Sequence, residues 1–261
     1  AIDSSSFRGS LYSPKKDAAH PRRFDANSFV NTTFRYRSDL VSDTLRPGFS
    51  TLVARNFYLN NTFRDTIFRI IAQSPLQTPG KYLYSCINFI LLQQVAEQQM
   101  QMPLNEILGR YFTAPLGAGN TLYNPLTRID SLWIVPTEDD FFVRRQLLRG
   151  YVHDEAAAFM GGVSGNAGLF SNANDLAKLL QMLLNEGVYG GERYLQQETL
   201  RLFTQSKTPN SHRGLGYESP GRRIPDFLPA DYLLHGRCMD IPVIRAPVSG
   251  SIRITGSSTY S

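Results

Sequence analysis

Ser13 and Lys16 have residue types and a spacing that could support hydrolytic chemistry. On a helix, this Ser-x-x-Lys spacing places the amine one turn from the hydroxyl, where it can help to activate a serine nucleophile. Such a helix must be buried, and it therefore needs an apolar face. The residues that follow, Asp17 to Arg23, offer none. We therefore interpret this stretch as a surface loop.

A second cluster with possible chemistry is the triplet His153, Asp154 and Glu155. These side chains could bind a metal ion or form a catalytic dyad. Adjacent residues in a loop rarely converge on one ion, however, and no second histidine lies nearby in the sequence. The pattern favours a role in ordering the loop.

The stretch from Phe159 to Gly187 is the segment around which the chain is organised. Its first half is a loop of small residues that can bend sharply and let another backbone approach closely; the glycines are Gly161, Gly162, Gly165 and Gly168. Asn172 and Asp175 then have the spacing of a helix capping box. Leucines follow at helical spacing, at positions 176, 179, 180, 183 and 184. This half is best interpreted as an ordinary core helix.

Further helices are predicted upstream of this stretch. The segment from Leu52 to Gln73 is predicted to be one helix, with core residues Phe57, Phe63, Ile67, Ile70 and Ile71. A loop with three breakers follows, and a second helix runs from Ile87 to about Gln99, with Ile87, Ile90, Leu91 and Val95 as its apolar residues. Tyr84 and Cys86 lie where the loop enters this helix. By residue type alone, both would be ordinary buried side chains.

The composition bounds the class of protein. The chain has 261 residues, of which 42% are hydrophobic and 19% charged, as expected for a globular protein. The net charge of +5 is modest and dispersed, which favours a solvated surface over a nucleic-acid-binding stripe. Cys86 and Cys238 form neither a disulfide framework nor a metal motif. No apolar run approaches the roughly 18 residues of a membrane-spanning helix.

Together with the preceding Gly150 to Ala157, the Phe159–Gly187 stretch resembles a block of the serine beta-lactamase-like superfamily. This group holds class C beta-lactamases, low-molecular-weight penicillin-binding proteins and related esterases. The resemblance runs from about Arg46 to Tyr217. It is closest to the beta-lactamase-like module at the C-terminus of some bacterial family 3 beta-N-acetylglucosaminidases.

The resemblance implies an α/β (α+β) fold of the beta-lactamase/transpeptidase type. In that fold an antiparallel sheet is flanked by terminal helices and joined to a mostly helical region. The chain would hold mostly the helical region and few strands of the sheet. The implied reaction is acyl transfer, in which a serine attacks a beta-lactam, peptide or ester carbonyl, and no cofactor is implied.

The resemblance also implies roles for Tyr84 and Cys86. The segment Tyr84-Ser85-Cys86 resembles the second motif of the family, which is Tyr-x-Asn or Tyr-Ser-Asp. Tyr84 would be the catalytic residue, because positive neighbours favour the phenolate and let it serve as a general base. Cys86 stands at the substrate-binding Asn or Asp position. A thiol is a weaker hydrogen-bond partner than an amide or a carboxylate.

The third motif of the family, Lys-Thr-Gly or His-Thr-Gly, is not found in its place. Lys207-Thr208-Pro209 resembles it, but Pro209 lacks the amide donor that the strand would use, so we interpret it as a decoy. Codons can be chosen for Met239 to Ser261 such that the same nucleotides, read from the third base, encode GHTGYTGTCVWIDPDHRLIYIF. This peptide resembles the missing strand. We therefore expect this tail to be translated out of frame, with the shift between Tyr217 and Met239.

These patterns predict the organisation of the chain. Residues 1–238 would be a partial serine beta-lactamase-like domain, with residues 1–50 as an irregular insertion, and residues 239–261 would be an irregular tail. The nucleophile motif is expected upstream of Ala1, so the chain is interpreted as an inactive fragment. The alternative is a non-catalytic binding or scaffolding module, attached to a cell-wall glycosidase, in which Tyr84 only packs.

The same resemblance sets expectations for partners and location. The parent would act on a small molecule or a peptidoglycan-type substrate and would not bind nucleic acid. An N-terminal glycoside hydrolase domain could be fused to it. We expect a periplasmic or cell-envelope parent, and we interpret the residues at the start of this sequence as something other than a signal peptide.

Overall fold

The computed structural model describes residues 21–23, 29–31, 36–75, 85–141, 143–205 and 214–215. The strands are β1 (Pro21–Arg23), β2 (Phe29–Asn31), β3 (Val41–Ser42), β4 (Thr51–Ala54), β5 (Phe57–Leu59), β6 (Leu122–Tyr123), β7 (Pro136–Asp140), β8 (Gln146–Arg149), β9 (Leu169–Phe170), β10 (Val188–Tyr189) and β11 (Glu192–Arg193). The helices are α2 (Phe63–Gln73), α3 (Ile87–Met100), α4 (Leu104–Leu108), α5 (Glu155–Phe159), α6 (Ala173–Leu184) and α7 (Gln197–Thr204), and the short helical turns are η1 (Gly109–Thr113), η2 (Pro125–Thr127) and η3 (Ser131–Trp133). This mixture of helices and short strands confirms the predicted fold class.

The largest sheet among the described residues has three antiparallel strands in the order β3-β5-β4. β4 and β5 form a hairpin whose turn contains Asn56 at φ 54°, a left-handed conformation that asparagine tolerates. The prediction of one helix from Leu52 to Gln73 is therefore wrong in its first part, because α2 begins only at Phe63. Phe57 and Leu59 are buried on either side of half-buried Tyr58, which is the alternation of a strand.

Helix α2 presents one apolar side to the core. Phe63, Ile67 and Ile71 recur at intervals of four residues and are buried. Ile70 is partly buried against the same cluster. The predicted core residues of this segment are thus confirmed, including Phe57, although Phe57 reaches the core from a strand.

Helix α3 is packed differently from its predicted pattern. Ile87 and Ile90 are buried as expected, and so is Gln93. Leu91 and Val95 were expected inside but are 44% and 53% exposed. The inward side of the helix is therefore partly polar, because it contacts polar backbone of another segment rather than a purely apolar core.

Helix α6 follows its predicted boundaries. Asn172 is the N-cap, and its side-chain oxygen accepts a hydrogen bond from the Asp175 amide at 2.8 Å. The Asp175 carboxylate instead accepts a hydrogen bond from the Asn120 amide at 2.7 Å, so only half of the capping box forms. Leu180 and Leu184 are exposed, and the buried side of the helix runs through Asp175 and Met182.

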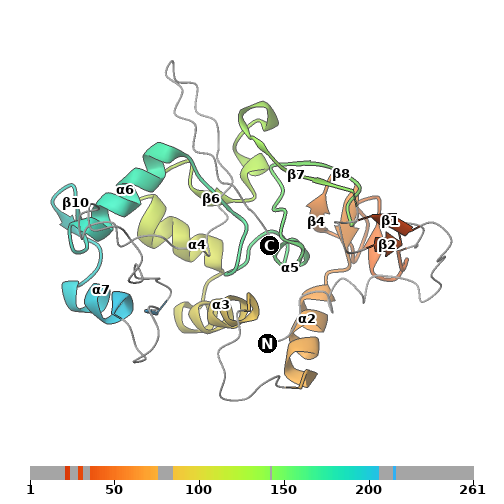
Figure 1. Ribbon diagram of the computed structural model, residues 1–261, viewed down its shortest axis with the longest axis horizontal. Coiled ribbons are helices and arrows are strands. Elements are labelled where there is room, and N and C mark those ends of the chain that lie inside the picture. The colour runs from red at the N-terminus through yellow and green to blue at the C-terminus, as the bar shows by residue number, and fades with distance from the viewer. Residues whose placement is uncertain are drawn as a thin grey trace.

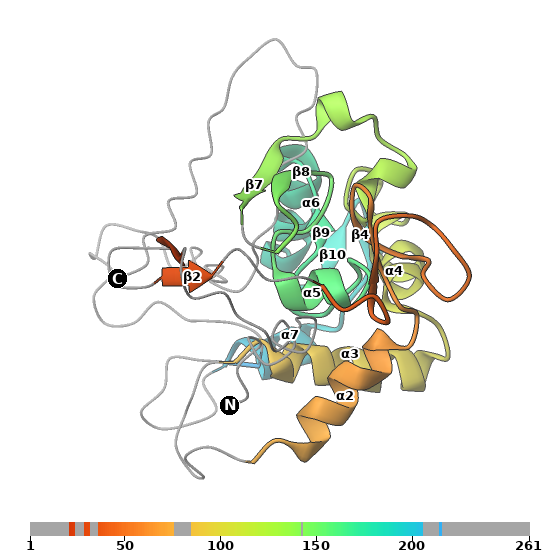
Figure 2. The same ribbon diagram turned by 90° about the vertical axis from the view of Figure 1, so that its right-hand side faces the viewer.

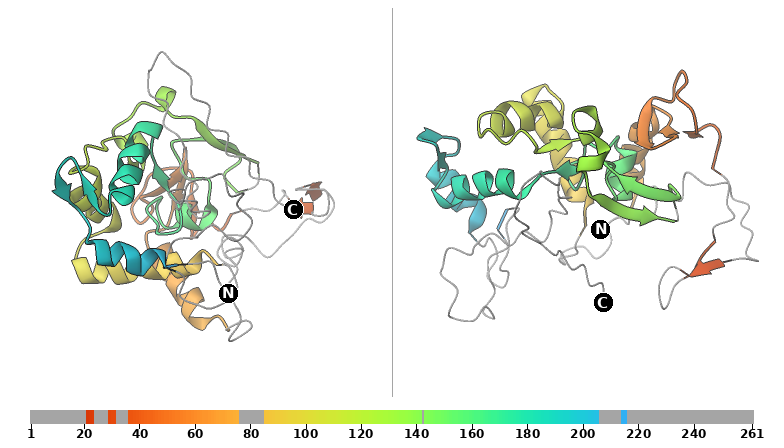
Figure 3. Two further views of the ribbon diagram at one scale, coloured as in Figure 1. Left: turned by 60° about the vertical axis from the view of Figure 1, so that its left-hand side comes forward. Right: turned by 90° about the horizontal axis from the view of Figure 1, so that it is seen from above.

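The main apolar core lies where the β4–β5 hairpin, α2, the first turns of α3, the β7–β8 hairpin and α5 meet. In Figure 1, α5 lies near the middle of the molecule, with β4 and α2 on one side and α4 and α6 on the other. Figure 2 gives the perpendicular view, and Figure 3 shows α6 and β10 toward one end of the molecule. None of the helices in the described ranges combines the length and apolar character needed to cross a membrane.

Candidate active site

The predicted site residues are only partly within the described structure. Cys86 is half-buried and occupies the N-cap position of α3. Ser85 precedes it, and its hydroxyl accepts a hydrogen bond from the Ile87 amide at 3.2 Å. Ser85 and Cys86, the described part of the motif, therefore lie at the entry to a helix. Tyr84 lies outside the described residues, as do Ser13, Lys16, Lys207–Pro209 and the tail from Met239. The roles assigned to Tyr84 and Cys86 remain predictions.

The glycine loop between α5 and β9 (residues 161–168) is hydrogen-bonded directly to α3. Gln93 Oε1 accepts a hydrogen bond from the Gly165 amide at 3.0 Å, and Gln93 Nε2 donates to the Val163 carbonyl at 3.2 Å. A Cβ on Gly165 would lie 2.3 Å from the carbonyl oxygen of Phe89. The close approach of two backbones that the sequence predicted for this loop is therefore present, and it takes place on the helix that begins with the Cys86 motif.

Sequence reasoning missed Gln93. Gln93 is a polar residue, yet it is only 3% exposed. The available signal was its spacing, because Gln93 lies three residues after buried Ile90 and would share its face. A polar residue on a buried face must find hydrogen-bond partners, and here those partners lie about seventy residues away in the chain.

Glu97, one turn beyond Gln93, extends this network to two more helices. Its carboxylate accepts hydrogen bonds from Gln93 Nε2 at 2.9 Å, from Arg64 on α2 at 2.7 Å and from the Leu104 amide at the start of α4 at 3.0 Å. Burial alone would raise the pKa of Glu97, but these hydrogen bonds and the Arg64 charge outweigh it and lower the pKa. Gln93 and Glu97 thus join α2, α3, α4 and the glycine loop.

The loop before α5 is ordered by Asp154. Its carboxylate caps α5 by accepting from the Ala157 amide at 2.7 Å, and it accepts from Asn166 Nδ2 at 3.0 Å. Asn166 in turn accepts from the Ser164 hydroxyl at 2.7 Å. The predicted ordering role of the 153–155 triplet therefore holds for Asp154. In the described part of the chain, no three potential ligand side chains gather as a metal site.

A buried arginine fixes the start of the same loop. Arg144 Nε donates to Asp140 at 2.5 Å, and its terminal nitrogens donate to the carbonyls of Val152 at 2.7 Å and His153 at 2.6 Å. Burial would raise the pKa of Asp140, but the charge of Arg144 and the hydrogen bonds to the carboxylate lower it. The β7–β8 hairpin is thereby tied to the segment that leads into α5.

Replacing Gln93 by alanine is expected to leave the Gly165 amide and the Val163 carbonyl without their side-chain partner. An unsatisfied buried polar group costs about 1–3 kcal/mol, so the free energy of unfolding should fall by about that amount. Urea denaturation followed by circular dichroism measures the change. Gln94→Ala is the matched control on the next residue, since Gln94 makes only a 3.4 Å contact with Glu97. If both variants lost the same unfolding free energy, the hydrogen bonds from Gln93 to the glycine loop would not be the cause.

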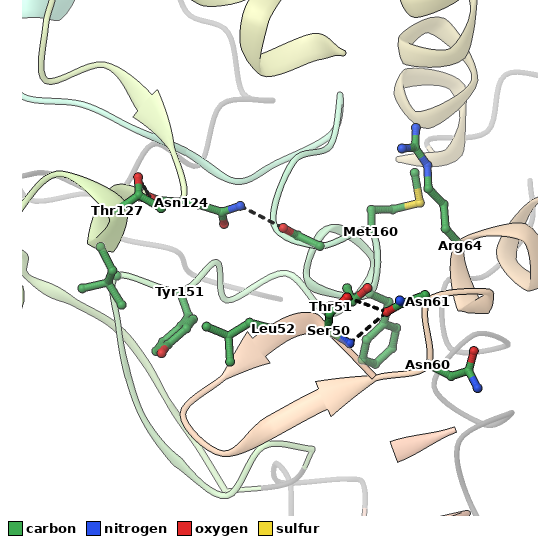
Figure 4. A pocket seen from close by; sticks show the side chains of 14 residues that line it. Ser50, Thr51, Leu52, Asn60, Asn61, Arg64, Asn124, Thr127, Tyr151 and Met160 are labelled. Carbon is green, nitrogen blue, oxygen red and sulfur yellow. Dashed lines mark hydrogen bonds between the residues drawn. The ribbon is translucent and has the colours of Figure 1, made fainter. Parts of the chain in front are cut away.

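A cavity of about 570 Å³ opens beside β4, away from Cys86. Its walls come from β4, the start of α2, the η2 turn and the end of α5; they include Ser50, Thr51, Leu52, Asn61, Arg64, Asn124, Leu126, Tyr151, Met160 and Gly161. Figure 4 shows Asn61 bonded to Ser50 and labels Leu52 and Tyr151 among the other lining residues. No residue of α3 is among its lining residues. Two of its lining residues nevertheless connect the cavity to α3: Gly161 begins the glycine loop that Gln93 holds, and Arg64 donates a hydrogen bond to Glu97.

Comparison with known proteins identifies related chains. A family model described as "Beta-lactamase" matches residues 35–222. A protein of Escherichia coli (strain K12), described as "Putative D-alanyl-D-alanine carboxypeptidase", is 37% identical over 166 residues, which is 58% of this chain and 38% of that protein. A protein of the same description from Salmonella schwarzengrund is 35% identical over 172 residues, or 60% of this chain and 40% of that protein. The chain thus spans about two fifths of the length of these relatives.

A solved structure gives a weaker match. It is titled "Crystal structure of putative beta-lactamase from Bacteroides dorei DSM 17855" and is 19% identical, covering 54% of this chain and 34% of that one. Its TM-score of 0.37 is too low to support a comparison of individual sites.

Proposed function

The chain belongs to the beta-lactamase family, and we propose from this that it is part of a serine hydrolase that transfers acyl groups in cell-wall metabolism. The family match over residues 35–222 carries the proposal. The carboxypeptidase relatives support a substrate with a peptide or related carbonyl, of the peptidoglycan type. They also support a parent protein located in the periplasm or cell envelope.

In the proposed mechanism, a serine of the intact protein attacks the substrate carbonyl. Tyr84, with a lysine beside it, takes the proton of the serine and later returns it, while backbone amides bind the oxyanion. Cys86 occupies the substrate-binding position of the motif and offers a thiol instead of an amide or a carboxylate. The position of Cys86 at the start of α3 and the attachment of the glycine loop to α3 both support this assignment.

We further propose that the chain as written does not catalyse this reaction. Ser13 to Lys16 is the sequence's one Ser-x-x-Lys stretch, and it lacks the apolar face of a buried helix. The third motif is also missing from its expected place, because we infer that residues 239–261 are read out of frame. The domain could be fused in the parent to an N-terminal glycoside hydrolase domain, in keeping with the glucosaminidase-like resemblance of the sequence.

Incubation of the 261-residue chain with a fluorescent penicillin is expected to give no covalent label, because the chain offers no suitable nucleophile. Gel fluorescence and intact mass spectrometry measure the label. The positive control is a lengthened protein that carries an upstream Ser-x-x-Lys helix and the alternative reading frame after Tyr217. Its serine should become covalently acylated by the penicillin.

Two outcomes would count against this account. Labelling of any serine in the 261-residue chain would show that it is active as written. A lengthened, folded protein that binds penicillin reversibly but never acylates would favour the non-catalytic module, in which Tyr84 only packs. Sequencing the gene across codons 217 to 261 tests the frame directly, because most codon choices are incompatible with the His-Thr-Gly reading.

A further inference from the structure

We propose that two copies of this chain associate through the outer face of α3, about a two-fold axis. At 3.6 residues per turn, six exposed residues share one side of this helix. They define the outer face and are Asn88, Leu91, Leu92, Val95, Gln98 and Gln99. The association goes beyond the proposed acyl transfer, because it requires neither a nucleophile nor a substrate.

The first support is that α3 has apolar residues on its outer side as well as on its inner side. Ile87 and Ile90 are buried in the core. Leu91, Leu92 and Val95 are 44%, 57% and 53% exposed. A helix that is apolar all round is normally covered all round, so the outer side is suited to a contact rather than to water.

The second support is that the outer face carries no charge. Glu97 is the one charged residue of α3, and its side chain is 15% exposed and paired with Arg64 of α2 at 2.7 Å. A solvated helix face normally carries charged residues. In a two-fold contact the same patch of both copies is used, so any charge near the axis would meet its own copy. An uncharged face avoids this repulsion, and it offers nothing to a partner of opposite charge.

The third support is that the order of residues on the outer face is complementary to itself. Along the helix the face presents an amide, then apolar residues, then amides again, and the centre of this pattern lies near position 93. A two-fold axis at that point sets the two helices antiparallel. It places Leu91 and Leu92 against Val95 of the second copy, which buries apolar surface. It also places Asn88 against the amides at positions 98 and 99, and side-chain amides can both donate and accept.

The proposal is tested first with the unaltered 261-residue chain. One helix face from each copy makes a small interface, so we expect a weak dimer with a Kd of about 10–200 µM. Sedimentation velocity between about 5 and 500 µM protein should show a monomer–dimer equilibrium. Raising the NaCl concentration from about 0.05 to 0.5 M should not weaken the dimer, because no charges meet across the outer face.

Two charged variants then test the two-fold arrangement. Val95→Lys and Val95→Glu each bring like charges together near the axis, so each should weaken dimerisation by at least about tenfold. An equimolar mixture of the two brings opposite charges together and should associate at least about tenfold more tightly than either variant alone. Leu147→Lys is the matched control, because Leu147 is equally exposed (55%, against 53% for Val95) but lies on β8. In Figures 1 and 2, β8 lies on the opposite side of the molecule from α3.

A chain that stays monomeric at about 500 µM would overturn the proposal and would leave the outer face to a different occupant. Open-ended aggregates instead of a dimer, unchanged dimerisation of Val95→Lys, a mixture no tighter than its components, or an equal loss in Leu147→Lys would also overturn it. The concentration series uses the unaltered chain, so it decides the question even where a variant fails to fold. The result is independent of the proposed enzyme activity, because dimerisation involves no acyl transfer.

Discussion

The Arg144→Ala variant is expected to lose about 3–5 kcal/mol of unfolding free energy, the usual cost of removing one partner from a buried ion pair. The Arg144 side chain is fully buried, and Asp140 is 4% exposed. The substitution would remove the guanidinium that contacts the Asp140 carboxylate, which keeps the amides of Val143 and residue 144 as donors. It would also remove the donors to the Val152 and His153 carbonyls. Urea denaturation at neutral pH measures the loss.

Two further variants test the physical cause. Arg37→Ala breaks an exposed ion pair with Asp39 and should change stability far less. The double variant Asp140→Leu with Arg144→Met removes both buried charges and should recover part of the loss. A single Arg144→Ala variant as stable as Arg37→Ala would contradict the role of the buried pair.

The same ion pair predicts a pH dependence. The folded-state pKa of Asp140 is lowered, so the pair contributes stability that is fully present above the unfolded carboxyl pKa of about 4. This contribution is lost as the pH falls through the lower, folded-state pKa. The stability difference between the unaltered chain and Arg144→Ala should therefore shrink below about pH 4.

Phe159→Ala is the second substitution expected to have a large effect, at about 3–5 kcal/mol of lost unfolding free energy. Phe159 ends α5 just before the glycine loop, and its side chain is 1% exposed. Its ring packs edge-to-face on Phe63 of α2, with centroids 5.8 Å apart and an interplanar angle of 88°. The substitution removes this contact and leaves a void between α2 and the loop.

The control for this variant is Phe203→Ala. Phe203 lies on α7 and is 41% exposed, so its removal should cost clearly less stability than the removal of Phe159. A double-mutant cycle of Phe63→Ala with Phe159→Ala should give a coupling of about 0.5–1.5 kcal/mol from the ring pair. A loss below about 1 kcal/mol for Phe159→Ala would mean that α5 does not anchor the core as described.

The sequence alone determined the features that arise from neighbouring residues. The helix from Ala173 to Leu184 was predictable, because Asn172 caps it locally and its apolar residues repeat with the helical period. The same holds for the start of α3 just after Cys86 and for the tight approach of the loop at Gly165. The resemblance of these segments also indicated the family that the comparison then identified.

Only the tertiary structure decided the features that depend on distant partners. Apolar residues between Leu52 and Leu59 suit either a helix or a strand, and the pairing of β5 with both β3 and β4 selected the strand. Gln93 and Arg144 have residue types that are normally exposed. They are buried because backbone groups brought close by the fold, such as Gly165 and Val152, satisfy their hydrogen bonds, and the energetic cost of burying a polar group depends on such partners.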